Sequence, residues 1–285
     1  MRFDTFVGID WSGDKSNYQR GISVALCKEG NLPPKIIKPK TKYWSRELLF
    51  EWINNLIISN TKVLVGFDFA FSYPFYDKSS YFPGIYSSPT NPKDLWKLID
   101  IINKDKANFY GGGIWNEKIY QEYYNAPGLK GVYYESRRRK TEIMAKNKVH
   151  SPSPTFNCVG PAGVGTGSLA GMRFLNRLKE KVDIWPFQTD FCYKKSVLVE
   201  IFPTYYFRMA GIKPDKGSGY NLNKINCALN YFSTNNLCKN IIIGGPDQDD
   251  ADAIISSAAL RHLSKKKYCW SIPNNSKKEG WIFGV

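Results

Sequence analysis

Short apolar runs, most of them closed by a polar or charged residue, alternate along the first quarter of this chain with one amphipathic segment. The runs predict strands over 3–9, 21–28, 34–39 and 63–68, and the amphipathic segment predicts a helix over 45–58. The apolar residues of this helix recur at 3.6-residue spacing, so one face should pack on a sheet. They are Leu48, Leu49, Trp52, Ile53 and Leu56. Three strands, a helix and a further strand predict a mixed α/β sheet with three antiparallel strands followed by parallel ones.

The pattern becomes irregular between about 70 and 195, where prolines punctuate aromatic-rich segments. Short helices are expected within it, such as 93–103, and a further helix is predicted over 168–181. This stretch is interpreted as a large insertion between the fourth and fifth strands. Since neither an internal repeat nor a low-complexity linker interrupts the chain, residues 1–285 are predicted to form a single domain.

Regular patterns return in the last third of the chain. A β-rich run predicts a strand over 197–201, followed by helices over 203–210, 221–233 and 249–264 and a short strand over 281–283. Together with the first quarter, this order predicts an RNase H-like mixed sheet flanked by helices.

Acidic residues stand where such a sheet would bring them together. Asp10 and Asp68 close two apolar runs, and Glu200 lies late in a third. Asp249 and Asp252 are three residues apart at the start of a helix, so they share one face in its first turn, where the helix dipole favours a carboxylate. Carboxylate oxygens are the ligands that Mg²⁺ prefers, and a cluster of them can hold two such ions.

Each acid also has a structural alternative. Asp10 could cap the turn that follows its strand, and Asp249 could be only a helix N-cap. Glu200 could orient a water molecule or simply face a lysine at the sheet edge. Asp247 and Asp250 are expected to be solvated. The catalytic interpretation is favoured for Asp10 because of its partner positions.

The formal net charge of +15 favours a polyanionic partner, because each neutralised phosphate releases counterions. A general enrichment in lysine, asparagine and isoleucine is the alternative explanation. The densest basic run is Arg137, Arg138, Arg139 and Lys140, which could contact a nucleic-acid backbone or be solvated.

A glycine-rich loop over 163–168 precedes the helix predicted at 168–181. Backbone amides and side chains at Gly165, Thr166 and Ser168 could cradle a phosphate at the helix N-terminus. The loop lacks the Lys-Ser/Thr ending of a P-loop, and a purely structural turn is the alternative.

The six cysteines are scattered without a CxxC pair or a matching histidine spacing, which favours buried free thiols over a zinc site or a disulfide framework. No signal-peptide pattern opens the chain, and no run approaches the roughly 18 apolar residues of a membrane span. A cytoplasmic location without a membrane partner is therefore expected.

Four segments resemble, in this order, the motifs of the domain of unknown function family 429, whose members are regarded as predicted RNase H-like nucleases. They are Gly8-Ile9-Asp10-Trp11-Ser12-Gly13, Gly66-Phe67-Asp68-Phe69-Ala70-Phe71-Ser72-Tyr73-Pro74, Glu200-Ile201-Phe202-Pro203 and Asp249-Asp250-Ala251-Asp252-Ala253. The loop over 163–168, the segment 184–189 and the ending 279–285 fit the same resemblance. The last acidic motif is also similar to the final catalytic helix of RuvC-type junction resolvases.

The resemblance and the acids together imply metal-dependent phosphodiester hydrolysis of nucleic acid, with Mg²⁺ or Mn²⁺ as cofactor. In this hypothesis Asp10 bridges two ions, Asp68 holds one of them, and Asp249 with Asp252 holds the other. An actin-like ATPase-type phosphotransferase and a non-catalytic nucleic-acid-binding module are the alternatives. An actin-like ATPase needs a duplicated fold and a second phosphate loop, and the sequence shows no such duplication.

Overall fold

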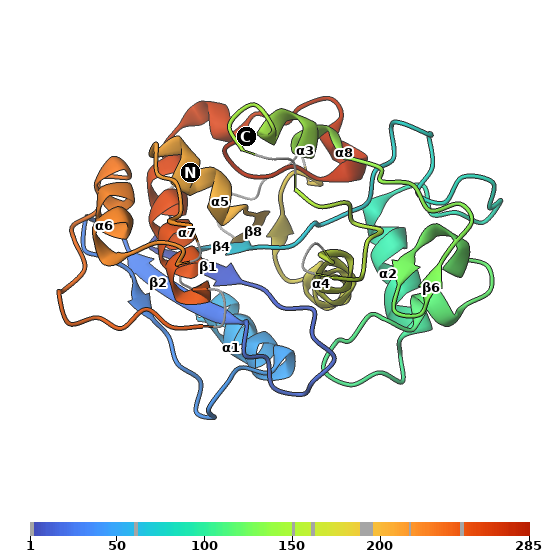
Figure 1. Cartoon of the computed structure of the whole chain (residues 1–285), viewed down its shortest axis with the longest axis horizontal. Coiled ribbons are helices and arrows are strands. Elements are labelled where there is room, and N and C mark those ends of the chain that lie inside the picture. The colour runs from blue at the N-terminus through green and yellow to red at the C-terminus, as the bar shows by residue number, and fades with distance from the viewer. Residues whose placement is uncertain are drawn as a thin grey trace.

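The computed structural model describes residues 3–59, 62–149, 152–160, 163–188, 196–216, 218–245 and 248–285. Its centre is a six-stranded mixed sheet flanked by helices (Figure 1). The strands lie in the order β3 (Lys35–Ile36), β2 (Ser23–Lys28), β1 (Thr5–Asp10), β4 (Val63–Phe67), β8 (Val197–Glu200) and β7 (Asp183–Ile184). The pairs β1–β2 and β2–β3 are antiparallel, whereas β1–β4, β4–β8 and β7–β8 are parallel.

The described helices surround this sheet. They are α1 (Arg46–Ile58), α2 (Pro92–Ile102), α3 (Lys140–Ala145), α4 (Gly165–Leu178), α5 (Pro203–Met209), α6 (Leu222–Tyr231), α7 (Asp249–Leu263) and α8 (Ser276–Glu279). Short 3₁₀ turns lie at Ile114–Asn116, Gln121–Tyr123 and Lys267–Trp270, and a small hairpin pairs β5 (Asn125–Ala126) with β6 (Leu129–Lys130). No helix of the described residues is both long and apolar enough to cross a membrane.

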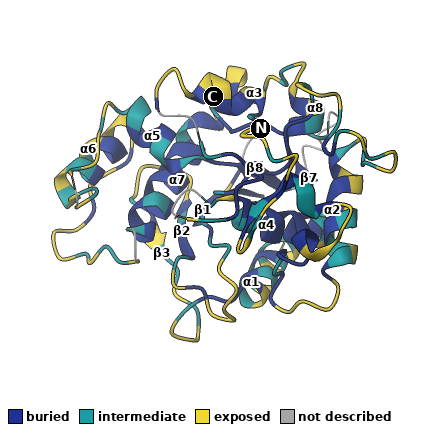
Figure 2. Cartoon of the chain, turned by 45° about the vertical axis from the view of Figure 1, so that its right-hand side comes forward, coloured by how far each residue is buried: buried dark blue, intermediate teal, exposed yellow. Residues whose placement is uncertain are grey.

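The sheet separates two apolar cores because successive side chains of a strand point to opposite faces. On one face Val7, Ile9 and Val65 pack with α1 and α4. On the other face Phe6 and Leu64 pack with α5, α6 and α7. Figure 2 shows the strands buried between these two layers, with the exposed residues on the outer loops and outer helix surfaces.

Capping residues mark where two helices begin. The Ser45 side chain accepts a hydrogen bond from the Leu48 amide at the start of α1, at 3.0 Å, and the Asn91 side chain accepts one from the Asp94 amide at the start of α2, at 3.0 Å. Proline at the first position of α2 suits a site where the backbone amide would lack a helical partner. These signals explain why both helices begin within a residue of their predicted start.

Helices α2 and α4 are joined by polar contacts outside the sheet. The Arg173 Nε donates to Asp100 Oδ1 at 3.0 Å, and the Asn176 amide and the Arg177 guanidinium donate to Asp100 Oδ2 at 2.9 and 3.1 Å. The Arg173 side chain is 3% exposed, so this carboxylate balances a buried cation. These hydrogen bonds hold α4 against α2.

Two strand predictions need correction. The strand predicted over 34–39 is only two residues long, and Pro34 and Pro39 at the ends of the predicted range have no amide hydrogen to offer a neighbouring strand. The terminal strand predicted over 281–283 is wrong: Ile282 forms an isolated bridge to Glu200, and the Phe283 amide donates to the Glu200 carbonyl at 2.9 Å. The sequence pattern did not indicate β7, the β5–β6 hairpin, α3 or α8.

The prediction for the cysteines holds only in part. Cys27, Cys158 and Cys269 are buried free thiols, but Cys227 and Cys238 are exposed. The exposed pair lies on and just after the amphipathic helix α6, which keeps an outer polar face. Cys192 lies outside the described residues, as do Thr189 of the motif over 184–189 and residues 161–162 near the glycine-rich loop.

Candidate active site

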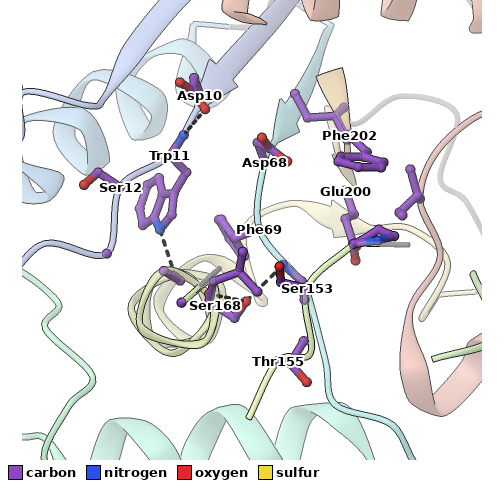
Figure 3. A pocket seen from close by; sticks show the side chains of 18 of the residues that line it. Asp10, Trp11, Ser12, Asp68, Phe69, Ser153, Thr155, Ser168, Glu200 and Phe202 are labelled. Carbon is purple, nitrogen blue, oxygen red and sulfur yellow. Dashed lines mark hydrogen bonds between the residues drawn. The ribbon is translucent and has the colours of Figure 1, made fainter. Parts of the chain in front are cut away.

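Asp10 and Asp68 lie at the carboxyl ends of two adjacent parallel strands. The register pairs Gly8 with Gly66 and Ile9 with Phe67, and the Asp68 amide donates to the Ile9 carbonyl at 3.0 Å. Both acids are therefore two positions beyond a paired glycine, and side chains two positions apart point to the same face of a strand. That face is the one covered by α7. Figure 3 shows the two carboxyl groups on neighbouring chain segments at the edge of one cavity.

Helix α7 packs directly on the β1 backbone through Gly8. A Cβ atom at Gly8 would lie 2.4 Å from the Ala253 carbonyl oxygen and 2.6 Å from the Ser257 nitrogen, so only glycine permits this approach. The contact brings the first turn of α7, which carries Asp249 and Asp252, beside the end of β1. Gln248 occupies the N-cap position, so Asp249 is the first helical residue rather than the cap.

The pKa values of Asp10 and Asp68 show that the acids influence one another. Burial is the main cause that raises the pKa of Asp10 well above its ordinary 3.8, followed by the negative charges of Asp252, Asp68 and Asp249. Burial also raises the pKa of Asp68 well above its ordinary value, followed by the charges of Asp252 and Glu200. Desolvation and like charges both disfavour ionised carboxyl groups. The structure thus concentrates negative charge from β1, β4 and α7 in one place.

The donor set suits a hard divalent cation. Within the described part of the chain, no three acidic, histidine or cysteine side chains form a ready-made ion-binding group. Asp10, Asp68, Asp249 and Asp252 nevertheless line one cavity, where burial and the charges of the other three all raise the pKa of Asp10. A bound cation would offset this repulsion, and carboxylate oxygens are the ligands that Mg²⁺ and Mn²⁺ prefer. Asp10, Asp68, Asp249 and Asp252 therefore fit the ion as its candidate ligands.

Glu200 occupies a different environment from the other acids. It pairs with Phe67 in the sheet register, so its side chain points to the face opposite to that of Asp10. Arg139 donates to both of its oxygens, Nη1 to Oε2 at 2.8 Å and Nη2 to Oε1 at 2.5 Å. The Phe71 amide donates to Oε2 at 3.0 Å. The partner of Glu200 is thus a buried arginine, not the lysine considered above, and Glu200 fixes the segment that follows Asp68.

Asp250 is not solvated, in contrast to the prediction. It is buried, and its Oδ1 accepts from the Ser23 hydroxyl at 2.5 Å. Its Oδ2 accepts from the Gly244 amide at 3.0 Å and lies 3.4 Å from the Lys38 Nζ. Asp250 therefore ties α7 to β2, while Asp247 lies outside the described residues.

The acids open into a cavity of about 470 Å³, whose other walls come from distant segments. The loop after β1 meets the start of α4 there: the Trp11 Nε1 donates to the Gly167 carbonyl at 2.9 Å, and a Cβ atom at Gly13 would lie 2.2 Å from the Gly167 nitrogen. Figure 3 shows the first turn of α4 facing the same space as Asp10 and Asp68. The N-terminal end of α4, which is the positive end of its helix dipole, therefore borders the cavity that the carboxylates line.

The three residues predicted to cradle a phosphate all lie in the first turn of α4, and all have internal partners. The Gly165 amide donates to the Asn157 carbonyl at 2.8 Å, and the Thr166 hydroxyl to the Cys158 carbonyl at 3.4 Å. The Ser168 hydroxyl donates to the Val164 carbonyl at 3.1 Å and accepts from the Ala70 amide at 3.3 Å. Of the three, Ser168 lines the cavity, where it links α4 to the segment after β4.

The basic run over 137–140 does not face solvent as a unit. The Arg137 guanidinium donates to both Asp77 oxygens, at 2.8 and 2.6 Å, and to the carbonyls of Pro74, Ser80 and Tyr81. Arg139 is 1% exposed and also donates to Glu142 at 2.8 Å. Arg138 is half-buried and Lys140 exposed. Arg137 and Arg139 therefore serve the fold, and of this run only Arg139 borders the cavity.

Thr155 is a cavity residue that the sequence did not reveal. It is fully buried and lines the cavity, and its hydroxyl has no hydrogen-bond partner among the described residues (Figure 3). A buried hydroxyl without a partner is costly, so a polar ligand in this cavity would offer compensation. No motif or periodicity surrounds Thr155 in the sequence.

Compared with models of protein families, with curated proteins and with solved structures, the chain matches none.

Proposed function

We propose that the protein is a divalent-cation-dependent phosphodiesterase that cleaves nucleic acid, on an RNase H-like fold. The sheet order β3-β2-β1-β4-β8, antiparallel in its first part and parallel in its second, supports this fold, as does the helix α7 over β1. In this proposal the insertion lies between β4 and β8, a stretch that also supplies α4 on the sheet and the edge strand β7. The motif resemblance to family 429 points to the same class.

One observation carries the proposal. Carboxyl groups from β1, β4 and α7 line a single cavity, where burial and the neighbouring negative charges raise the pKa of Asp10 and Asp68. A cluster of like charges lowers the stability of a fold, so such clusters are typical of sites where function requires them. The four acids Asp10, Asp68, Asp249 and Asp252 would hold the cation. When bound, such ions supply a nucleophile at neutral pH and neutralise the charge that develops on the phosphate.

The remaining residues of the cavity position these groups. Glu200 and Arg139 fix the chain after Asp68 through the Phe71 amide. Gly13 and Trp11 seat the loop after β1 against α4, whose dipole favours an anionic substrate near Ser168. The net charge of +15 supports a polyanionic substrate over a neutral one.

The test is cleavage of end-labelled DNA and RNA, single-stranded and duplex, with Mg²⁺ or Mn²⁺ and with EDTA. We expect metal-dependent cleavage that Asp10→Asn abolishes and that Asp105→Asn retains, because Asp105 is an exposed carboxylate outside the cavity. Cleavage that survives in Asp10→Asn would contradict the proposal. Stabilisation by ATP without cleavage would instead favour a phosphotransferase.

A further inference from the structure

A second cavity, of about 300 Å³, shares the lining residue Asp249 with the first. Arg20, Lys38, Lys42 and Tyr43 stand around it, and we call these four residues the basic groove. Asp249 lines both cavities, and the neighbours Arg20 and Gly21 line one each. The groove therefore continues directly from the carboxylate cluster along the β2 and β3 side of the sheet.

Two of the three cations of the groove, Arg20 and Lys42, lie near its aromatic ring. The Arg20 Cζ lies 5.9 Å and the Lys42 Nζ 5.4 Å from the centroid of the Tyr43 ring. Both basic side chains are exposed, and neither forms an ion pair with a carboxylate of the described residues. Two cations and one aromatic ring are thus grouped at one place, and both cations can turn to an anion while the ring meets a base.

The acids at the floor of the groove do not cancel this positive charge. Asp250 is already balanced by Lys38, the Ser23 hydroxyl and the Gly244 amide. Asp249 also lines the first cavity, where it belongs to the carboxylate cluster with Asp10. Arg20 and Lys42 thus remain as cationic groups at the mouth, next to a half-buried aromatic ring.

We propose that the basic groove binds the phosphodiester backbone of a single nucleic-acid strand beside the carboxylate cluster, with Tyr43 stacking on one base. This inference rests on the proposed function and names its substrate form. Arginine and lysine side chains next to an aromatic ring are the usual elements of single-strand binding, since unpaired bases can stack and phosphates are neutralised. The paired bases of a duplex are stacked on one another and would not reach the ring.

The test separates binding from cleavage by measuring fluorescence anisotropy of short labelled DNA and RNA strands in EDTA. Arg20→Ala/Lys42→Ala should weaken binding about tenfold and reduce the slope of log K against log salt by about 1.4, because two phosphate contacts are lost. Tyr43→Ala should weaken binding about tenfold with little change in that slope. Lys265→Ala/Lys267→Ala is the matched control: it removes two exposed cations beyond the far end of α7.

Several outcomes would overturn the inference. They are wild-type affinity in Arg20→Ala/Lys42→Ala, an equal loss in the control pair, and tighter binding of a duplex than of a single strand. Unchanged melting temperatures show that the variants fold. Asp10→Asn should bind strands in EDTA like the wild type but fail to cleave with Mg²⁺. Binding through the groove without any cleavage by the wild type would reject the proposed function and leave the groove intact.

Discussion

Arg139 and Glu200 form a buried ion pair in which Nη1 donates to Oε2 and Nη2 to Oε1, and each residue is at most 2% exposed. Removal of one partner leaves an uncompensated buried charge, so Arg139→Met should lower the free energy of unfolding by about 3–5 kcal/mol. Urea denaturation measures this change. Lys140→Met is the control, because it removes an exposed charge from the neighbouring position and should change stability little.

The same pair decides the role of Glu200. If Glu200 positions the chain through the Phe71 amide, Glu200→Gln should lower stability by about 1–2 kcal/mol while much of the Mg²⁺-dependent cleavage persists, because the remaining carbonyl oxygen still accepts a hydrogen bond and Glu142 still balances Arg139. Cleavage assays and urea denaturation of one preparation give both quantities. Loss of cleavage at unchanged stability would identify Glu200 as a cation ligand instead.

Cation binding should be visible without any substrate. At a Mg²⁺ concentration about 100 times the dissociation constant, wild-type protein should gain about 2.7 kcal/mol of stability, which corresponds to a melting temperature about 5 °C higher. Asp10→Asn and Asp68→Asn should lose most of this gain, whereas Asp105→Asn should keep it. Differential scanning fluorimetry with Mg²⁺ and with EDTA measures the shift. A shift of equal size in all four proteins would place the ion elsewhere.

Gly8→Ala should separate the acids without removing any of them. The added methyl group meets the Ala253 carbonyl at 2.4 Å, so α7 must move away from β1. We expect a cost of about 1–3 kcal/mol from overpacking. We also expect an activity loss of about 100-fold, because displacement of catalytic groups by about 1 Å has such an effect. Gly21→Ala is the stability control, since its methyl group would meet Ser12 at an ordinary 3.5 Å.

Asp100 should stabilise the α2–α4 contact in a pH-dependent way. Although burial opposes ionisation, hydrogen bonds from Asn176, Arg173 and Arg177 hold the pKa of this carboxyl below its ordinary 3.8. Its contribution is therefore present above pH 3.8 and lost as the pH falls through the lowered value.

Asp100→Asn should accordingly cost about 3 kcal/mol at pH 7, because Arg173 loses its counter-charge, and the difference from wild type should shrink below pH 3.8. Urea denaturation across this range measures both. A difference that stays constant down to acid pH would show that the carboxylate charge contributes nothing.

Local patterns were enough to predict the strand ends and the helix that carry Asp10, Asp68, Asp249 and Asp252. Apolar runs and capping residues act over a few positions, so β1, α1, β4 and α7 agree with their predicted ranges within two residues. The mixed character of the sheet, antiparallel in its first part and parallel in its second, is confirmed as well.

The environment of Glu200 could not be predicted, because it depends on the register of β8 against β4 and on an arginine 61 positions away. A sequence shows alternation along one strand but not which face two distant strands share. The internal partners of Arg137 and Asp250 were missed for the same reason: both arise from contacts between remote segments. The metal requirement and the nuclease activity stay predictions that the experiments above address.

The bridge between Ile282 and Glu200 has a consequence for biosynthesis. Since the Phe283 amide and the Glu279 carbonyl contact the Glu200–Arg139 pair, the cavity wall is complete only when this late segment has been translated. There is therefore an interval during translation in which β1, β4 and β8 have left the ribosome but the residues up to 283 have not. In this interval the Glu200–Arg139 pair lacks its contacts with the late segment. Chaperone dependence during translation should be greatest in that interval.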